Sequence, residues 1–193
     1  MTTPKPPEFS AVLLAAGRST RMGRDKALLE IAGVPLWRRQ REVLGRAGAA
    51  EIFVSARADQ AWAAAENVVR DAVPDGGPLG GIAAALERAA HPHLAVLAVD
   101  LPRMEPAWFA ALLADCAPAA GAVGRHGGDG GFFEPLAAVY PRALLPFAAA
   151  ALARGEFSLQ RLLTAAVAQR LMRVREIGPA EAAMLANWNE PAP

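Results

Sequence analysis

The sequence contains a single cysteine, Cys116, among its 193 residues. One thiol excludes an intramolecular disulfide, and it leaves no CxxC pair that could form a metal or redox site. A chain without disulfides is compatible with a reducing compartment. We therefore expect a cytoplasmic protein.

The chain also lacks a charge excess and any long apolar run. Its 20 Lys and Arg residues oppose 19 Asp and Glu residues, so the net charge of +1 gives no general attraction to nucleic acid or to a membrane. No stretch approaches the roughly 18 consecutive apolar residues of a membrane-spanning helix. The first nine residues, MTTPKPPEF, have no apolar segment of the kind found in signal peptides. These absences predict a soluble protein with neither nucleic-acid nor membrane partners.

Neither a repeat nor a long linker interrupts the sequence. Hydrophobic residues make up 53% of it, which is enough to bury a sizeable core at this length. The sequence therefore predicts one domain over residues 1–193, of which residues 1–8 are a flexible lead-in.

Short apolar segments alternate with helical patterns along the chain, which is typical of an α/β fold with a mostly parallel sheet. Strands are expected at residues 9–15, 51–55, 67–71, 94–99, 119–123 and 171–177, and helices at 36–47, 59–65, 82–90, 106–116, 141–153 and 158–169. The segment FFEPLAAVY, residues 132–140, is expected to be one antiparallel strand. The proline near its start is typical of an edge or a bulge.

The first strand leads into a loop with small and basic residues. Ala15, Ala16 and Gly17 have little or no side chain, so their backbone N–H groups can approach phosphate oxygens closely. Four cations follow within nine residues, namely Arg18, Arg21, Arg24 and Lys26. Small residues followed by cations favour binding of a nucleoside triphosphate. The alternative is a solvated basic loop, while the absence of a GxxxxGK[ST] or GxGxxG motif disfavours ATPases and dehydrogenases.

Three further positions lie where ligands of α/β sheets bind, at the carboxyl ends of expected strands. Ser55 and Asp71 end two of them, and Asp100 follows the most apolar one. A carboxylate there suits Mg²⁺, which prefers oxygen ligands, although an aspartate that caps a helix is the alternative. The glycine-rich segment PDGGPLGGI, residues 74–82, precedes an expected helix; it is interpreted either as part of the anion site or as an ordinary loop.

The histidines give weaker indications. His91 and His93 are separated only by a proline and have no acidic neighbour, which disfavours a metal site. His126 lies in the loop GRHGGDGG, residues 124–131, which is expected to be mobile at the ligand-binding face. Solvent exposure is the main expectation for His126, with contact to an acceptor substrate as the alternative.

Taken together, these segments resemble the molybdenum cofactor guanylyltransferases, which join GTP to molybdopterin. The matching segments are LAAGRSTRMGRDKALL at 14–29, GVPLW at 33–37, Asp71 before GGPLGGI, DLP at 100–102, EPLAAVY at 134–140 and NWNEP at 187–191. The resemblance implies a three-layer α/β/α, Rossmann-like nucleotidyltransferase fold. It also implies GTP and molybdopterin as substrates, Mg²⁺ as cofactor, and transient contacts with molybdopterin-delivering and molybdoenzyme-maturation proteins.

Residue roles follow from the resemblance by position. Those implied at the nucleotide are Leu14, Ala15, Ala16, Gly17, Ser55, Asp71, Gly77 and Gly81. Arg21 and Lys26 are expected to act on the phosphates, and Asp100 to hold the magnesium ion. Asn187 and Asn189 match a terminal NxN pair that lies by the substrate site in the family.

Three departures from the family pattern keep other functions open. Ala16 stands where the family usually has glycine, and LAAG is common in related cytidylyltransferases, so CTP with molybdopterin or another phosphorylated acceptor is an alternative. Glu190 replaces the threonine of NxNTP, and Ser55 stands where an amide side chain can occur. A non-catalytic nucleotide-binding module of the same fold is the third reading.

Overall fold

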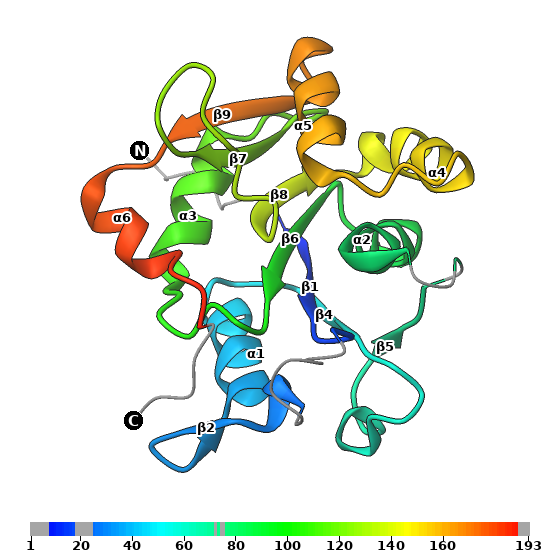
Figure 1. Cartoon of the computed structure of the whole chain (residues 1–193), viewed down its shortest axis with the longest axis vertical. Coiled ribbons are helices and arrows are strands. Elements are labelled where there is room, and N and C mark those ends of the chain that lie inside the picture. The colour runs from blue at the N-terminus through cyan, green and yellow to red at the C-terminus, as the bar shows by residue number, and fades with distance from the viewer. Residues whose placement is uncertain (1–7, 18–24, 72, 74–75, 189–193) are drawn as a thin grey trace.

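The computed structural model describes residues 8–17, 25–71, 73 and 76–188. Their centre is a seven-stranded sheet with the strand order β5-β4-β1-β6-β8-β7-β9 (Figure 1). The strands are β1 (Ser10–Leu14), β4 (Glu51–Ser55), β5 (Val68–Val69), β6 (His93–Ala98), β7 (Gly121–Arg125), β8 (Ala137–Pro141) and β9 (Met172–Glu176). The apolar strands β1 and β6 lie in the middle of the sheet, because only a strand covered on both faces can bury a continuous apolar run.

All strands of this sheet except β8 run in the same direction. β1 pairs in parallel with β4 and β6, β4 with β5, and β7 with β9, whereas β8 is antiparallel to both β6 and β7. The expected mostly parallel sheet with one antiparallel strand is confirmed. The carboxyl ends of β1, β4 and β6 consequently lie side by side at one edge, where ligands of such sheets bind.

Helices cover both faces of the sheet and complete the three expected layers (Figure 1). One face carries α1 (Leu36–Arg46) and α3 (Pro106–Asp115), and the other carries α2 (Gly77–Arg88), α4 (Leu145–Ala153) and α5 (Leu159–Ala168). The remaining elements are the 3-10 turns η1 (Lys26–Leu28), η2 (Ala61–Ala63) and η3 (Arg142–Leu144), the hairpin β2 (Glu30–Ile31) and β3 (Val34–Pro35), and α6 (Pro179–Met184).

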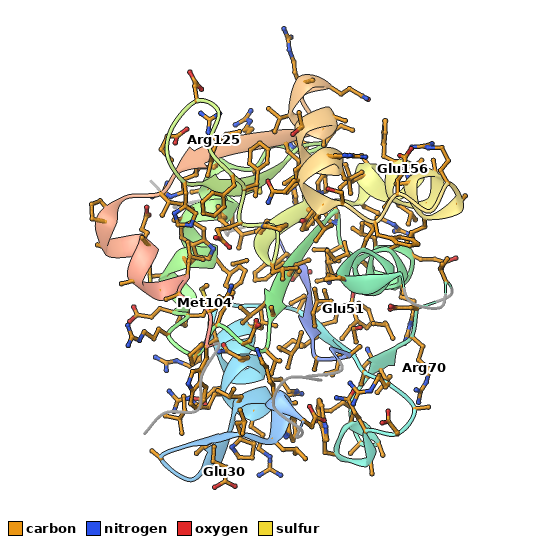
Figure 2. All side chains as sticks on the ribbon, in the orientation of Figure 1. Glu30, Glu51, Arg70, Met104, Arg125 and Glu156 are labelled. Carbon is orange, nitrogen blue, oxygen red and sulfur yellow. The ribbon has the colours of Figure 1, made fainter. Side chains whose placement is uncertain are left out.

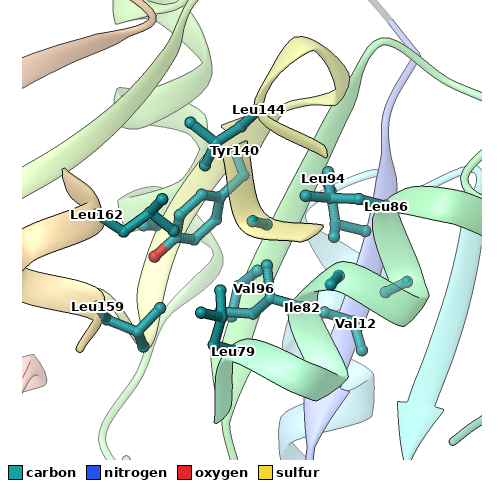
Figure 3. Close-up of a cluster of buried hydrophobic side chains, with 14 of the residues drawn as sticks. Val12, Leu79, Ile82, Leu86, Leu94, Val96, Tyr140, Leu144, Leu159 and Leu162 are labelled. Carbon is teal, nitrogen blue, oxygen red and sulfur yellow. The ribbon is translucent and has the colours of Figure 1, made fainter. Parts of the chain in front are cut away.

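The apolar core continues through the sheet. On the face covered by α2, Val12 of β1 and Val96 of β6 pack against Ile82, as Figure 3 shows. On the opposite face, Leu36 of α1 and Trp108 of α3 are almost fully buried. Charged side chains such as Glu30, Arg70 and Glu156 lie at the periphery (Figure 2). Within the described residues, no helix has the length and apolar character needed to cross a membrane.

Two expected elements before α2 are shorter than predicted. The helix expected at 59–65 is only the 3-10 turn η2, because the side chain of Gln60 bonds the N–H of Arg57 and holds a turn there. The strand expected at 67–71 contains only the two residues of β5.

Two other boundaries differ from the expectation. The helix expected at 82–90 already begins at Gly77, since Pro78 is compatible with a first helical turn. The strand expected at 132–140 begins only at Ala137. Before it, the N–H of Phe133 donates to the side chain of Gln160, and Pro135 has no N–H for a ladder.

Candidate active site

A cavity of about 520 Å³ opens at the carboxyl ends of β1, β4 and β6. Its lining consists of Leu14, Ala15, Ala16, Gly17, Asp25, Lys26, Ser55, Arg57, Asp71, Gly77, Pro78, Ala98, Val99, Asp100 and Leu136. These residues come from segments that are far apart in the sequence and that the parallel sheet brings to one edge.

Most of the predicted site residues meet in this cavity. Leu14, Ala15, Ala16, Gly17, Lys26, Ser55, Asp71, Gly77 and Asp100 all line it. Gly81 lies behind the lining, in α2, and Asn187 is exposed and does not line the cavity. Arg21 and Asn189 lie outside the described residues, as do Arg18, Arg24 and Glu190.

Lys26 and Asp100 form an ion pair in the lining of the cavity. The Lys26 Nζ lies 3.6 Å from an Asp100 carboxylate oxygen, and the two side chains are 21% and 27% exposed. The C-terminal segment joins them, because Lys26 donates to the Trp188 carbonyl at 3.3 Å and the Trp188 N–H donates to the Asp100 carbonyl at 2.9 Å. A cation and a carboxylate at the mouth of one cavity are suited to binding a phosphate and a metal ion, respectively.

The interpretation of Asp100 as a helix cap is wrong. The next helix, α3, begins only at Pro106, and its N-cap residue is Glu105. Asp100 instead lies in the turn that follows β6. Its carboxylate therefore caps no helix, and Asp100 lines the cavity instead.

The glycines of α2 allow the helix to approach the strand ends closely. A Cβ atom added to Gly80 would lie 2.7 Å from an Asp71 carboxylate oxygen, and one added to Gly81 would lie 2.6 Å from the Ser55 hydroxyl oxygen. Gly77 has a φ of +60°, a conformation that glycine adopts without strain, and it lines the cavity. Residues 77–82 of the glycine-rich segment thus form the first turns of a helix and not a loop.

Asp71 is held in an unfavourable setting for a carboxylate. Its Oδ1 is buried and has no hydrogen-bond partner in the described part of the chain. Burial raises the pKa of this carboxyl above its ordinary value of 3.8. An unpartnered polar atom at a cavity wall is typical of a group that bonds a ligand.

Sequence reasoning missed two polar residues of the lining, Asp25 and Arg57. The Asp25 carboxylate accepts hydrogen bonds from the Gln60 amide and the Trp62 indole, and Arg57 donates to the carbonyls of Ala16 and Gly17. Arg57 follows the carboxyl end of a strand by two residues, and that position was a usable signal. For Asp25 the signal was its place directly before Lys26.

Two histidines outside this cavity, His93 and His126, have protein partners. The ring of His93 is within hydrogen-bond distance of the carbonyls of Ala117 and Ala120, at 3.0 and 3.2 Å. The Nε2 of His126 lies 2.9 Å from a Glu134 carboxylate oxygen, and its ring stacks on Phe132. Burial raises the pKa of Glu134, and the nearby His126 opposes that rise. Contact of His126 with an acceptor stays a prediction.

The cavity fits a divalent cation of the magnesium type. The described residues include no cluster of three or more His, Cys, Asp and Glu side chains that could hold a metal by themselves. Mg²⁺ is usually held by one or two carboxylates together with substrate phosphates. The partly exposed carboxylate of Asp100 at the cavity wall matches that donor set.

Comparison with known proteins places this arrangement among transferases. Residues 11–171 match the family model described as the MobA-like NTP transferase domain. A protein of Opitutus terrae named "probable molybdenum cofactor guanylyltransferase" is 46% identical over 95% of this chain and 91% of its own length. A molybdenum cofactor guanylyltransferase of Pseudomonas putida is 37% identical over 86% of this chain and 87% of its own.

Solved structures show the same fold at lower sequence identity. The molybdopterin-guanine dinucleotide biosynthesis protein A of Archaeoglobus fulgidus has a TM-score of 0.70 at 20% identity, over 94% of this chain and 93% of that one. The 2-C-methyl-D-erythritol 4-phosphate cytidylyltransferase of Thermus thermophilus has a TM-score of 0.67 at 20% identity, over 95% and 94%. At such identities the likeness establishes the nucleotidyltransferase fold alone.

Proposed function

The chain belongs to the MobA-like NTP transferase family, and we propose that it transfers GMP from GTP to molybdopterin, with release of pyrophosphate. The observation that carries the proposal is the cavity in which Lys26 and Asp100 face each other beside the small residues 15–17. The choice of guanine and of molybdopterin comes from the relatives that cover most of the chain.

The proposed reaction needs no protein nucleophile. A terminal phosphate oxygen of molybdopterin attacks the α-phosphorus of GTP, one P–O bond forms, and the bond between the α-phosphorus and the bridging oxygen breaks. Pyrophosphate carries away the electron pair of that bond. Since both substrates are anionic, catalysis rests on positioning them and on neutralising the charge of the leaving group.

The residues divide this work by their position in the cavity. The backbone of residues 15–17 and the ammonium of Lys26 would hold the triphosphate, together with Arg21, which lies outside the described residues. Ser55 and Asp71 would contact the guanosine from the ends of their strands, with Leu14, Gly77 and Gly81 shaping the pocket. Asn187 and Asn189 would lie by the molybdopterin.

A divalent cation, which we propose to be Mg²⁺, would be held by Asp100 and would neutralise phosphate oxygens when bound. Lys26 keeps its ammonium close to that carboxylate, so a phosphate bound beside the pair can accept hydrogen bonds from a cation next to the metal position. Transient contacts with proteins that deliver molybdopterin and mature molybdoenzymes are part of the same proposal.

Cytidylyl transfer is the second candidate, and Ala16 favours it. Ala16 lines the cavity at a position where guanylyltransferases usually have glycine. Related cytidylyltransferases commonly have the sequence LAAG, with alanine at this position, as this chain does. The third reading, a non-catalytic nucleotide-binding module, has less support because such a module does not need Lys26 and Asp100 to face each other.

Calorimetric titration of the purified protein with GTP and with CTP, each with and without Mg²⁺, tests the nucleotide half of the proposal. We expect saturable binding of GTP that strengthens with Mg²⁺, and at least about tenfold weaker binding of CTP. Preference for CTP would overturn the choice of guanine. Binding of neither nucleotide would contradict the transferase function itself.

A further inference from the structure

Three side chains from the segment between β4 and β5 donate hydrogen bonds to residues 15–17 and Asp25 of the cavity lining. They are Arg57, Gln60 and Trp62, and we refer to them as the strap. Gln60 is only 5% exposed, although an amide side chain of this kind is usually found at the surface. A buried amide is retained where its hydrogen bonds are satisfied, so the partners of the strap indicate what it holds.

The strap fixes the carbonyl groups of residues 15–17. Gln60 donates to the Ala15 carbonyl at 3.0 Å, and the guanidinium of Arg57 donates to those of Ala16 and Gly17, both at 2.8 Å. In a trans peptide the C=O and the following N–H point in opposite directions. The N–H groups of Ala16 and Gly17 therefore point away from the strap.

Among the described residues, neither of those two N–H groups donates to a protein acceptor. Both residues line the cavity. Successive backbone N–H groups that point the same way and have no protein acceptor form a site for an anion.

The strap also holds the segment that carries Lys26. One oxygen of Asp25 accepts from the Gln60 amide at 2.8 Å and from the Trp62 indole at 2.9 Å. The other accepts from the N–H of Ala27 at 3.0 Å and so caps the turn η1. With three N–H donors around it, the Asp25 carboxylate is committed to this turn and not to a metal ion.

We propose that the strap sets the geometry of the triphosphate site, with Gln60 as its central positioning residue. The Gln60 amide nitrogen donates to both sides, to the Ala15 carbonyl and to Asp25, and so fixes the distance between the N–H groups of residues 16–17 and the Lys26 ammonium. This inference rests on the proposed function, because it assumes a nucleoside triphosphate in the cavity. The inference adds Gln60 and Trp62 as residues that position the phosphate-binding groups without contacting the phosphates themselves.

Binding of inorganic tripolyphosphate tests the strap without involving the base or the acceptor. We expect Gln60→Leu to weaken tripolyphosphate and GTP by about tenfold or more, and Trp62→Phe, which keeps the ring stacked on Trp37, by a few-fold. Affinity for guanosine should not change in either variant. Arg41→Gln is the matched control, because it breaks an ion pair of 2.8 Å with Glu66 away from the cavity.

Unchanged tripolyphosphate affinity in both strap variants would overturn the inference, and so would absence of tripolyphosphate binding by the natural protein. An equal loss of guanosine affinity would do the same, because it would show a general loss of structure. Suppose that the natural protein prefers CTP and that its Gln60→Leu variant loses tripolyphosphate binding. This outcome would support the role of the strap and contradict guanylyl transfer. Trp62→Phe keeps the test available if Gln60→Leu does not fold.

Discussion

Lys26 and Asp100 face each other because their segments leave the sheet at the same edge. Lys26 belongs to the turn that Asp25 caps, and Asp100 lies in the turn after β6, two residues beyond its last residue. The ends of β1 and β6 lie side by side, since these strands pair residue by residue from Ser10 to Leu14, while the hydrogen bonds of Asp25 hold the turn that carries Lys26. The chemistry of the site therefore depends on individual side chains at strand ends.

Asp100→Asn tests the role of the carboxylate at this scale. An amide keeps the size of the side chain but loses its charge, so we expect turnover to fall by about 10²-fold or more while the fold is retained. Pyrophosphate release with saturating substrates measures the turnover, and circular dichroism checks the fold. Near-normal turnover in the presence of Mg²⁺ would show that Asp100 does not hold the metal ion.

Asp71→Asn is expected to stabilise the ligand-free protein and to weaken GTP binding. Burial raises the pKa of Asp71, so the folded state binds this proton more tightly than the unfolded state. The ionised carboxylate consequently lowers stability at pH values above the raised pKa, and this penalty disappears as the pH falls below 3.8.

Thermal unfolding of both proteins at about pH 7 and about pH 3.5 measures that difference. The midpoint of Asp71→Asn should be higher than that of the natural protein at the upper pH, with the gap closing at the lower one. GTP affinity should fall about tenfold if Asp71 bonds the guanosine. A gap that is the same at both pH values would show that burial of the charge is not its cause.

At the scale of elements, the close approach of α2 to the strand ends shapes one wall of the cavity. Gly81→Ala would place its Cβ 2.6 Å from the Ser55 hydroxyl and 3.1 Å from a methyl group of Leu14. Either these side chains or the helix must shift, so we expect a loss of about 1–3 kcal/mol in the free energy of unfolding, together with weaker GTP binding. Denaturant unfolding and calorimetric titration measure these two effects.

Gly45→Ala is the matched control for that substitution. Gly45 also lies within a helix, α1, but the nearest atom to an added Cβ is a methyl group of Ile52 at 3.9 Å. Alanine favours a helix interior by about 0.5–1 kcal/mol over glycine, so this variant should gain stability and keep its affinity for GTP. Equal behaviour of the two variants would contradict the importance of close packing at Gly81.

The order of the elements could be predicted from the sequence, and most of the cavity lining too, because strand ends such as Ser55 and Asp100 follow visible apolar runs. The polar contacts around Gln60 could not, because they join Ala15 and Asp25 through a segment whose alanines favour a helix. Tertiary hydrogen bonds override local propensity there. The helix start at Gly77 was missed for a related reason, since glycines usually indicate a loop until a close packing partner is known.

At the scale of the whole molecule, one sheet carries the two large apolar clusters, one on each face. We therefore predict that the 193 residues unfold as one domain, in a single calorimetric transition with an enthalpy of about 130 kcal/mol. Two separated transitions in scanning calorimetry would contradict the single domain.

The most direct test of guanylyl transfer is to incubate the purified protein with molybdopterin, Mg²⁺ and equal amounts of GTP and CTP, and to identify the product by mass spectrometry. Our account predicts the guanine dinucleotide of molybdopterin, formed together with one pyrophosphate for each product molecule. Formation of the cytosine dinucleotide would contradict the proposed base. Formation of neither dinucleotide, although nucleotide is bound, would contradict catalysis by this chain.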